Sequence, residues 1–493
     1  MFNVLGFWAD VPGWVNTAWT VLDMGIRIVM LGIVPGNRRP TTAMAWLLAI
    51  FFIPVVGLLL FLLFGNYRMS RRRTIRQAVI NERVLEETKH MELEGDVLES
   101  PDWVQSAVKL NRHLGAMPVV EGNAVELYTD YRESIVAMTE AIRTAKCYVH
   151  VEFYIVGEDE EYTAPLLDAM VAAADRGVNV RFLFDHLGTM RVTGYRRLLK
   201  RLKASKISWR PSLPLAPVHR QWRRPDLRNH RKIVVVDGIV AFTGSQNLIE
   251  PGYKRSSSHK IGRTWVELMA KVQGPLVASL DVVFTTDWAQ ETDENLLEDV
   301  RTISPLNVPG AVTGQLVPSG PGFVAENNLR LFNSLIYSAT KELRITSPYF
   351  VPDDSLLYAV TTAAQRGVRV RLYVSERGDQ ALAHHAQQSY YLALLQAGVE
   401  IYLYEAPHVL HTKCFTVDNE VGVFGSSNMD MRSFSLNFEV TMMLLGPDIV
   451  ARLDDVMDEY EGRSKRVQLG EWNSRPPFER WKDNVARLSA TLQ

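Results

Sequence analysis

The sequence predicts an α/β protein whose two halves arose by internal duplication and follow an apolar N-terminal segment. Two copies of one short motif, a matching alternation of strand-like and helix-like stretches around each copy, and a long uncharged run near the N-terminus lead to this prediction. We therefore expect two pseudo-twofold-related lobes, each a mixed sheet flanked by helices, after a pair of transmembrane helices.

The repeated motif reads H-x-K-x-x-x-x-D, and six residues separate its aspartate from a following G-S-x-N. Its polar members are His230, Lys232, Asp237, Ser245 and Asn247 in the first copy, and His411, Lys413, Asp418, Ser426 and Asn428 in the second. One copy of so short a pattern is weak evidence. Two copies with the same internal distances indicate a duplicated functional element.

Strand-like and helix-like stretches alternate in both halves. In the first half we expect strands at 124–128, 148–156 and 178–185, and helices at 131–145 and 164–175. In the second half we expect helices at 329–340 and 355–365, and strands at 343–349 and 368–374. The segments AAADRGVNVRFLF (172–184) and TAAQRGVRVRLYV (362–374) align, so the duplication extends beyond the motif. In both segments an Arg-Gly pair is typical of a helix end.

Two apolar stretches precede this repeat. Residues 14–35 contain Asp23 and Arg27, which lie four apart on one helix face and can neutralise each other. Residues 43–65 contain no charge, which predicts a transmembrane helix kinked at Pro54. The arginines that follow place residue 66 onward in the cytoplasm by the positive-inside rule. The N-terminus is then also cytoplasmic, or lies outside if the first stretch rests in the interface.

Charge and cysteine content narrow the function classes. Residues 1–80 carry a net charge of +6, from eight arginines and two acids, which leaves −7 for the remainder of a chain whose total is −1. A basic region beside apolar runs favours membrane contact, and the acidic remainder argues against nucleic-acid binding. Cys147 and Cys414 lie in apolar runs, so we expect two buried, reduced thiols and no metal site.

The predicted organisation has four parts. They are a transmembrane segment over residues 1–66, a basic and then polar helical linker over 67–115, a first lobe over 116–300, and a second lobe over 301–493. The second lobe includes a C-terminal tail over 471–493, with Trp472, Phe478 and Trp481 among charges. This tail is either a surface or membrane-facing helix or a helix packed on the lobe.

Each motif predicts a β-hairpin with one reactive face. Asp237-Gly238 favours a two-residue turn that pairs Lys232 with Thr243 and His230 with Ser245. The second copy gives the same arrangement, so each half presents an imidazole, an ammonium, a hydroxyl and an amide on one side. The aspartates are included among the candidate catalytic residues, but their position favours turn formation or orientation.

These groups suit a phosphodiester. Lysine and asparagine can hold its non-bridging oxygens, while one histidine attacks phosphorus and the other protonates the leaving alcohol. Glu267 and Glu439, each in a following strand, are candidates to fix the imidazole tautomers. Five arginines precede or fall within the first copy, and they favour an anionic lipid near His230 as the nucleophile. They are Arg220, Arg223, Arg224, Arg228 and Arg231.

The paired motifs resemble the phospholipase D superfamily, and the whole layout from about residue 13 resembles bacterial cardiolipin synthases. The N-terminal run RRPTTAMAWLLAIFFIPVVGLLLFLLFG and the segments NHRKIVVVDG, TGSQN and GSSNMDMRSFSLNFE carry the resemblance. It implies two phospholipase D-like lobes around one metal-free and cofactor-free site in the bacterial plasma membrane. The implied reaction transfers a phosphatidyl group between two phosphatidylglycerol molecules, releasing glycerol. Glu267 stands where an aspartate is common in relatives.

Other functions are compatible with the same motifs. A hydrolase would use water as the acceptor, and a related transferase would use another alcohol. A nuclease acts on the same type of bond, and a scaffold would need neither histidine. Acceptor specificity, acyl-chain preference and oligomeric state do not follow from the sequence.

Overall fold

The computed structural model describes residues 13–36, 38, 40–65, 71–89, 96–214, 226–292, 294–296, 310–323 and 326–490. The chain forms two compact units, Met1–Arg68 and Met69–Gln493.

The N-terminal unit consists of short helices. They are α1 (Gly13–Ile33), α2 (Pro40–Phe52), α3 (Pro54–Leu60) and a π-helical turn (Phe61–Gly65). The single kinked helix predicted over 43–65 is therefore divided at Pro54, whose ring cannot continue the helix. α3 folds back against α2. The two helices are so close that a Cβ on Gly57 would fall 2.4 Å from the carbonyl oxygen of Ala49. Across the described ranges, no helix combines the length and the apolar character needed to cross a membrane.

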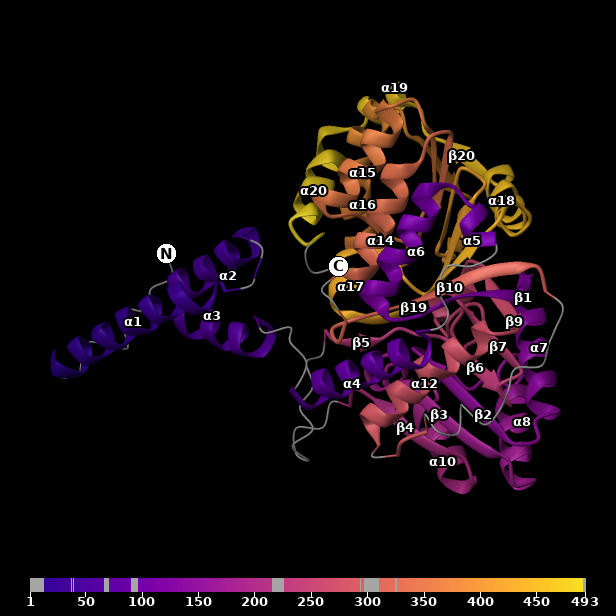
Figure 1. The fold of residues 1–493 in the computed structure, drawn as a ribbon. Helices are drawn as coiled ribbons and strands as arrows, with labels where there is room; N and C mark the ends of the chain where they lie inside the picture. The colour runs from indigo at the N-terminus through magenta and orange to yellow at the C-terminus, as the bar shows by residue number, and fades with distance from the viewer. Residues whose placement is uncertain are drawn as a thin grey trace. The chain divides into compact units, whose positions relative to one another are not determined.

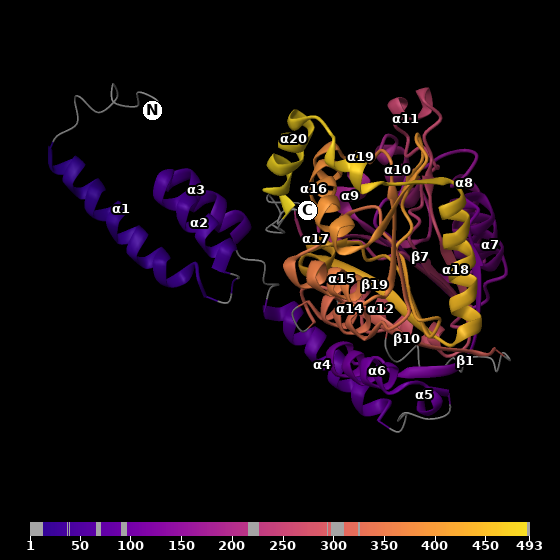
Figure 2. The ribbon, with the colours of Figure 1, turned by 90° about the horizontal axis from the view of Figure 1, so that it is seen from above.

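The second unit is built on one sixteen-stranded mixed sheet (Figures 1 and 2). From one edge, the first half contributes β4 (Ser208–Ser212), β3 (Asn179–Asp185), β2 (Tyr148–Phe153), β6 (Ile233–Val236), β7 (Val240–Gly244), β9 (Met269–Gln273) and β1 (Val119–Tyr128). The second half continues with β10 (Val312–Ser319), β19 (Asn437–Leu445), β17 (Val421–Gly425), β16 (Cys414–Val417), β11 (Glu342–Thr346), β13 (Arg369–Ser375), β14 (Glu400–Tyr404) and β20 (Ser464–Arg466). The sixteenth strand, β5 (Arg228–Asn229), lies off this order and pairs with β19.

The order of the strands repeats outward from the centre of this sheet. β1 and β10 pair antiparallel there, with Val119 opposite Gln315 and Val120 opposite Gly314. On either side, β9, β7, β6, β2 and β3 of the first half correspond to β19, β17, β16, β11 and β13 of the second. The duplication seen in the sequence is therefore a pseudo-twofold relation within one continuous sheet.

Helices cover the sheet in matching positions. The first half has α7 (Tyr131–Arg143), α8 (Ala164–Asp175), α10 (Tyr195–Ala204) and α12 (Leu276–Glu291). The second half has α14 (Asn327–Ser338), α15 (Asp354–Gln365), α16 (Ala381–Ala397) and α18 (Pro447–Gly462). Buried side chains of α12 and α18 share one apolar core that contains strands of both halves, while the other helices of each half pack into two separate cores. α12 and α18 thus join the two halves.

The polar segment before the repeat is docked on this unit. It forms α4 (Arg71–Glu87), α5 (Asp96–Glu99) and α6 (Asp102–Gly115). Arg73 lies 2.8 Å from Glu291 at the end of α12. The side-chain amide of Asn111 donates to the carbonyl of Leu316 at 3.0 Å. Residues predicted to link two parts of the chain are therefore partly built into the second one.

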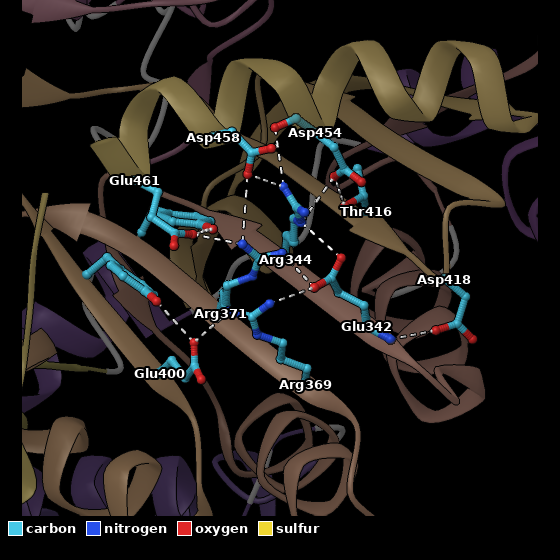
Figure 3. Close-up of polar contacts among 12 residues, drawn as sticks. Glu342, Arg344, Arg369, Arg371, Glu400, Thr416, Asp418, Asp454, Asp458 and Glu461 are labelled. Carbon is cyan, nitrogen blue, oxygen red and sulfur yellow. Dashed lines mark hydrogen bonds and ion pairs between the residues drawn. The ribbon is translucent and has the colours of Figure 1, made fainter. Parts of the chain in front are cut away.

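A network of ion pairs fixes α18 on the second half of the sheet (Figure 3). Arg371 on β13 bonds to Glu461 at 2.8 Å and to Glu342 at 2.5 Å, and Arg344 on β11 bonds to Asp458 at 2.6 Å. Although burial alone lowers it, these acids raise the pKa of Arg371 above its usual value. The corresponding contacts in the first half use an imidazole and a phenol, because His150 and Tyr148 both bond to Asp281.

The two cysteines differ in exposure. Cys414 is buried, as predicted, and burial raises the pKa of its thiol. Cys147 is exposed, so the prediction of a second buried thiol is wrong. It precedes β2, where its backbone amide donates to the carboxylate of Asp237 at 2.8 Å and its carbonyl accepts the amide of Asn179 at 3.0 Å.

Candidate functional site

Both motifs form hairpins with the predicted turn but a different register. The amide of Ile239 donates to the carbonyl of Val236 at 3.0 Å, and Asp237 and Gly238 both have left-handed φ angles, as a type I′ turn requires. The ladder beyond the turn, however, pairs Val236 with Val240. Ile239 is thus an extra residue on the returning strand, and it shifts every later pair by one.

The shift corrects the predicted reactive face. Thr243 lies opposite Ile233, not Lys232, so it faces away from the lysine. The second hairpin has the same shift, with Val417 opposite Val421. The serines nevertheless reach the site, because each follows the glycine that ends its strand and its hydroxyl turns to a glutamate. Ser245 donates to Glu267 at 2.6 Å, and Ser426 donates to Glu439 at 2.5 Å.

The two motif aspartates lie at the turns. The carboxylate of Asp237 accepts the amides of Lys146, Cys147 and Tyr148 at 2.7–2.8 Å. Asp418 accepts equivalent amides ahead of β11, and these bonds help to hold its pKa below the usual range although burial opposes this. A four-residue strand separates each aspartate from its lysine, so both carboxylates lie outside the histidine cluster. They connect the hairpins to β2 and β11.

The histidines are held crosswise between the two halves. Nδ1 of His230, in the first half, lies 2.9 Å from Oε2 of Glu439 in the second. Nδ1 of His411, in the second half, lies 2.8 Å from Oε1 of Glu267 in the first. All four side chains are buried. Each half therefore supplies the carboxylate that orients the histidine of the other half.

Short parallel strand pairs produce this crossing. β5 (Arg228–Asn229) pairs with β19, and the amide of His230 then donates to the carbonyl of Phe438 at 2.9 Å. β15 (Val409–Leu410) pairs with β8 (Trp265–Val266), and the amide of His411 donates to Val266 at 2.8 Å. The backbone before each histidine is thus fixed next to the glutamate of the opposite half.

The environment favours neutral imidazoles and ionised carboxylates in the substrate-free protein. Burial lowers the pKa of His230 to about 4, although Glu439 acts in the opposite direction. The pKa of His411 is lowered for the same reason. The carboxyl pKa values of Glu267 and Glu439 stay below the usual range in spite of burial, because the histidines and lysines favour the charged form. With Nδ1–H directed at a carboxylate, Nε2 of each ring carries the free electron pair.

Burial and neighbouring charges also shift the pKa values of the two motif lysines. Burial, together with the charge of Lys413, lowers the pKa of Lys232 to about 7, although Glu439 acts in the opposite direction. Burial likewise lowers the pKa of Lys413 to about 8, against the effect of Glu267 and Glu439. Each ammonium donates to the carbonyl of the motif histidine two residues before it, and an anionic ligand would raise both pKa values. The centre is therefore suited to a bound phosphate.

The two asparagines differ in availability. The side-chain amide of Asn247 donates to the hydroxyl of Tyr253 at 2.9 Å, and its oxygen accepts the amide of Ile155 at 3.2 Å. Among the described residues, nothing bonds to the buried Oδ1 of Asn428. Asn247 thus supports the surrounding structure, while Asn428 keeps hydrogen-bonding capacity.

Two tyrosines belong to this cluster although the sequence did not indicate them. The ring of Tyr154 lies edge-on to His230 with centroids 4.8 Å apart. The hydroxyl of Tyr253 donates to Glu267 at 3.0 Å, and its left-handed φ of 57° is unusual for a bulky residue. Their positions depend on loops after β2 and after Asn247, so no local pattern identifies them.

The two members of the predicted arginine cluster that lie in the described residues form internal ion pairs and have structural roles. Arg231 is buried against Asp287, and its Nη2 donates to the carbonyl of Ser319 at 3.1 Å. Arg228 is buried and lies 3.2 Å from Asp185. The other three, Arg220, Arg223 and Arg224, lie outside the described residues. No group of three or more histidine, cysteine, aspartate or glutamate side chains within the described ranges is placed to hold a metal ion.

Comparison with known proteins places this site in a family. Residues 138–288 and 332–460 match the family described as cardiolipin synthase, PLD-like domain, and together they cover more than half of the chain. The chain belongs to the cardiolipin synthase family. Both motifs fall within the matched residues. Residues 25–66 match a second family, described as phospholipase D-nuclease N-terminal.

Curated relatives agree with this membership of the cardiolipin synthase family. The chain is 33% identical to a cardiolipin synthase of Halalkalibacterium halodurans over 100% of its own length and 96% of the relative's. It is 34% identical to cardiolipin synthase A of Proteus mirabilis over 92% and 94% of the two chains. A phosphatidylserine synthase of Haemophilus influenzae shares the fold, with a TM-score of 0.60, 14% identity and coverage of 78% of this chain and 99% of the other.

Proposed function

We propose that the crosswise pair of histidines performs the phosphatidyl transfer of a cardiolipin synthase. The main observation behind this proposal is that His230 and His411 each bond to a carboxylate from the opposite half. Neither half contains a complete dyad, so one reaction centre requires both. Two imidazoles with free Nε2 atoms beside two lysines match a reaction that needs a nucleophile and a separate proton carrier.

In the first step, Nε2 of His230 attacks phosphorus of one phosphatidylglycerol. The N–P bond forms as the P–O bond to glycerol breaks, and His411 gives its proton to the departing oxygen. The anionic donor favours protonation of His411 and of the lysines when it binds. Lys232 and Lys413 stabilise the non-bridging oxygens.

In the second step, His411 takes the proton from a hydroxyl of a second phosphatidylglycerol. That oxygen attacks phosphorus, the N–P bond breaks, and His230 is regenerated with cardiolipin as the product. His230 is assigned as the nucleophile, and burial, which lowers its pKa to about 4, keeps its ring neutral and able to attack. Glu439 and Glu267 position the two rings and balance the charge that develops on them.

In this proposal, three of the predicted substrate-binding residues do not touch the lipid but hold other side chains of the site in place. They are Ser245, Ser426 and Asn247. The serine hydroxyls hold the glutamates, and Asn247 holds Tyr253. A substrate-binding role is retained for Asn428, but its free Oδ1 would accept a hydrogen bond from a lipid hydroxyl group and would not hold the anionic oxygens. Asp237 and Asp418 hold the hairpins and take no part in bond making.

We also propose that the N-terminal unit holds the enzyme in the bacterial plasma membrane. Its surface exposes many large apolar side chains, including Trp14, Phe52 and Leu62, which water solvates poorly. Asp23 and Arg27 pair at 2.7 Å, which lowers the cost of placing them in lipid. Since α3 folds back against α2, residues 43–65 do not fit a single crossing, and the proposal keeps membrane attachment with the catalytic unit in the cytoplasm. Labelling of introduced cysteines from each side of inverted vesicles tests it, and external labelling beyond residue 66 in intact cells would contradict it.

Product analysis tests the reaction. The purified full-length chain, given phosphatidylglycerol alone, is expected to release one glycerol for each cardiolipin formed. Phosphatidic acid as the main product would identify a hydrolase, and a requirement for added serine or ethanolamine would identify another acceptor. His230→Ala and His411→Ala should each abolish the product, and Cys147→Ser is a matched control at an exposed residue away from the site.

A further inference from the structure

We propose that α20 (Pro477–Arg487) is an interfacial helix that rests on an anionic bilayer surface. Four large apolar side chains, Phe478, Trp481, Val485 and Leu488, are exposed by 65%, 59%, 46% and 82%. Their spacing of three, four and three residues places them on one face of the helix. Phe478 and Trp481 stack with ring centroids 5.9 Å apart, so they form one continuous surface.

The opposite face of α20 is fixed to the catalytic unit. Asp483 and Ala486 are buried, and the Asp483 carboxylate lies 2.7 Å from Nδ1 of His385 on α16. Arg475 also pairs with Asp483, and its guanidinium lies 3.8 Å from the ring of Trp472. Figure 2 shows α20 beside α16 at the periphery of this unit. The apolar stripe is therefore held outward by a defined set of contacts.

Basic side chains border the stripe. At 100° per residue, Lys482 lies next to Phe478 on one side, and Arg480 lies beyond the stripe on the other. Lys482 also pairs with Glu479 at 2.7 Å, and Arg487 packs over the ring of Tyr390 on α16. Nζ of Lys482 is 5.4 Å from the centroid of the Phe478 ring. Aromatic and aliphatic side chains flanked by cations are the pattern by which helices bind the headgroup region of anionic membranes.

A bilayer fits this surface better than a second copy of the chain. A stable protein interface buries about 800 Å² on each partner, from roughly 20–30 residues, and four side chains on one short helix supply far less. The substrates of a cardiolipin synthase also lie in a bilayer, so the catalytic unit must meet one. The inference goes beyond the proposed chemistry, because it concerns a surface that contains no residue of the reaction centre.

Site-specific quenching tests the contact. In a Cys147→Ser background of the full-length chain, Trp481→Cys and the control Arg480→Cys each receive an environment-sensitive fluorophore. Both positions are exposed and adjacent in sequence, but they point to different sides of α20. In proteoliposomes containing phosphatidylglycerol and doxyl-labelled lipid, we expect quenching at position 481 to exceed that at 480 by about threefold or more. The difference should shrink when phosphatidylcholine replaces phosphatidylglycerol.

Two results would overturn the inference. One is equal quenching at the two positions. The other is a fluorescence change at position 481 that depends on protein concentration in detergent, since it would identify a second copy as the occupant. A kinetic test adds a functional readout. Phe478→Ser combined with Trp481→Ser should reduce cardiolipin formation several-fold on vesicles and leave turnover in mixed micelles unchanged. Equal losses on both substrates would contradict membrane docking without touching the proposed reaction.

Discussion

Glu439→Gln separates the roles of the two histidines. The substitution keeps the size of the side chain and removes the charge that faces Nδ1 of His230 at 2.9 Å. A buried hydrogen bond to a charged group contributes about 1.5–3 kcal/mol, and every 1.4 kcal/mol changes a rate tenfold. We therefore expect the phosphohistidine on His230 to form about 10- to 150-fold more slowly. The matched variant, Glu267→Gln, removes the same interaction from His411.

The assay uses two donors in rapid-quench experiments. Phosphatidylglycerol needs a proton on its leaving oxygen, whereas a phosphatidyl ester of p-nitrophenol does not. With phosphatidylglycerol, both variants should form the adduct slowly. With the activated ester, Glu267→Gln should recover adduct formation because the acid is no longer needed, and Glu439→Gln should remain slow because the nucleophile is still impaired.

The opposite pattern would refute the assignment. Recovery in Glu439→Gln, with a persistent defect in Glu267→Gln, would make His411 the nucleophile. Equal recovery in both would contradict the idea that each glutamate serves a separate histidine. Circular dichroism and thermal unfolding of both variants control for loss of folding, since both carboxylates are buried.

Three further predictions concern stability and the supporting groups. Asp237→Ala removes three backbone hydrogen bonds and should lower the free energy of unfolding by about 2–4 kcal/mol in urea titrations. The folded fraction should keep near-normal turnover. Loss of turnover at full stability would contradict the structural role of Asp237. The pKa values of Lys232 and Lys413, about 7 and about 8, lie below the unfolded value, so the unfolded chain binds more protons and stability should rise from about pH 7 to pH 10. Thermal unfolding should show this rise in the wild type and a smaller one in Lys232→Met, and a flat wild-type profile would exclude it. Tyr253→Phe removes one hydrogen bond to Glu267 and should slow turnover about 3- to 10-fold. It should also shift the acidic limb of the pH–rate profile. An unchanged profile would mean that Tyr253 contributes only to packing.

Local features of the fold could be predicted from the sequence because their causes are local. α8 occupies the predicted residues 164–175, and Gly177 and Gly367 end α8 and α15 with φ values of 92° and 93°. Only glycine adopts this conformation without cost, so the two Arg-Gly pairs identify the helix ends directly. The Asp237-Gly238 turn followed for the same reason.

Features that depend on distant segments could not be predicted in this way. The extra residue at Ile239 shifts the hairpin register, and it is stabilised by pairing of β7 with β9, far along the chain. The crosswise contact of Glu439 with His230 depends on the parallel pair of β5 and β19. The sequence indicated a glutamate behind each histidine, but it could not assign the glutamate of one half to the histidine of the other.

The break at Pro54 shows a limit of a different kind. Hydrophobicity measures whether a segment prefers lipid to water, and residues 43–65 are apolar throughout. It does not determine the path of the backbone, which here returns on itself so that Gly57 contacts Ala49. The small side chain at position 57 permits this close approach, because any larger residue would collide with α2.

Identification of the phosphorylated residue tests the central claim most directly. Enzyme mixed with labelled phosphatidylglycerol, quenched at alkaline pH where phosphohistidine survives, can be digested and mapped by mass spectrometry. The account predicts a phosphatidyl adduct on His230 that disappears as cardiolipin forms and is absent from His230→Ala. Cardiolipin formation without an adduct on either His230 or His411 would contradict the two-step reaction at this site.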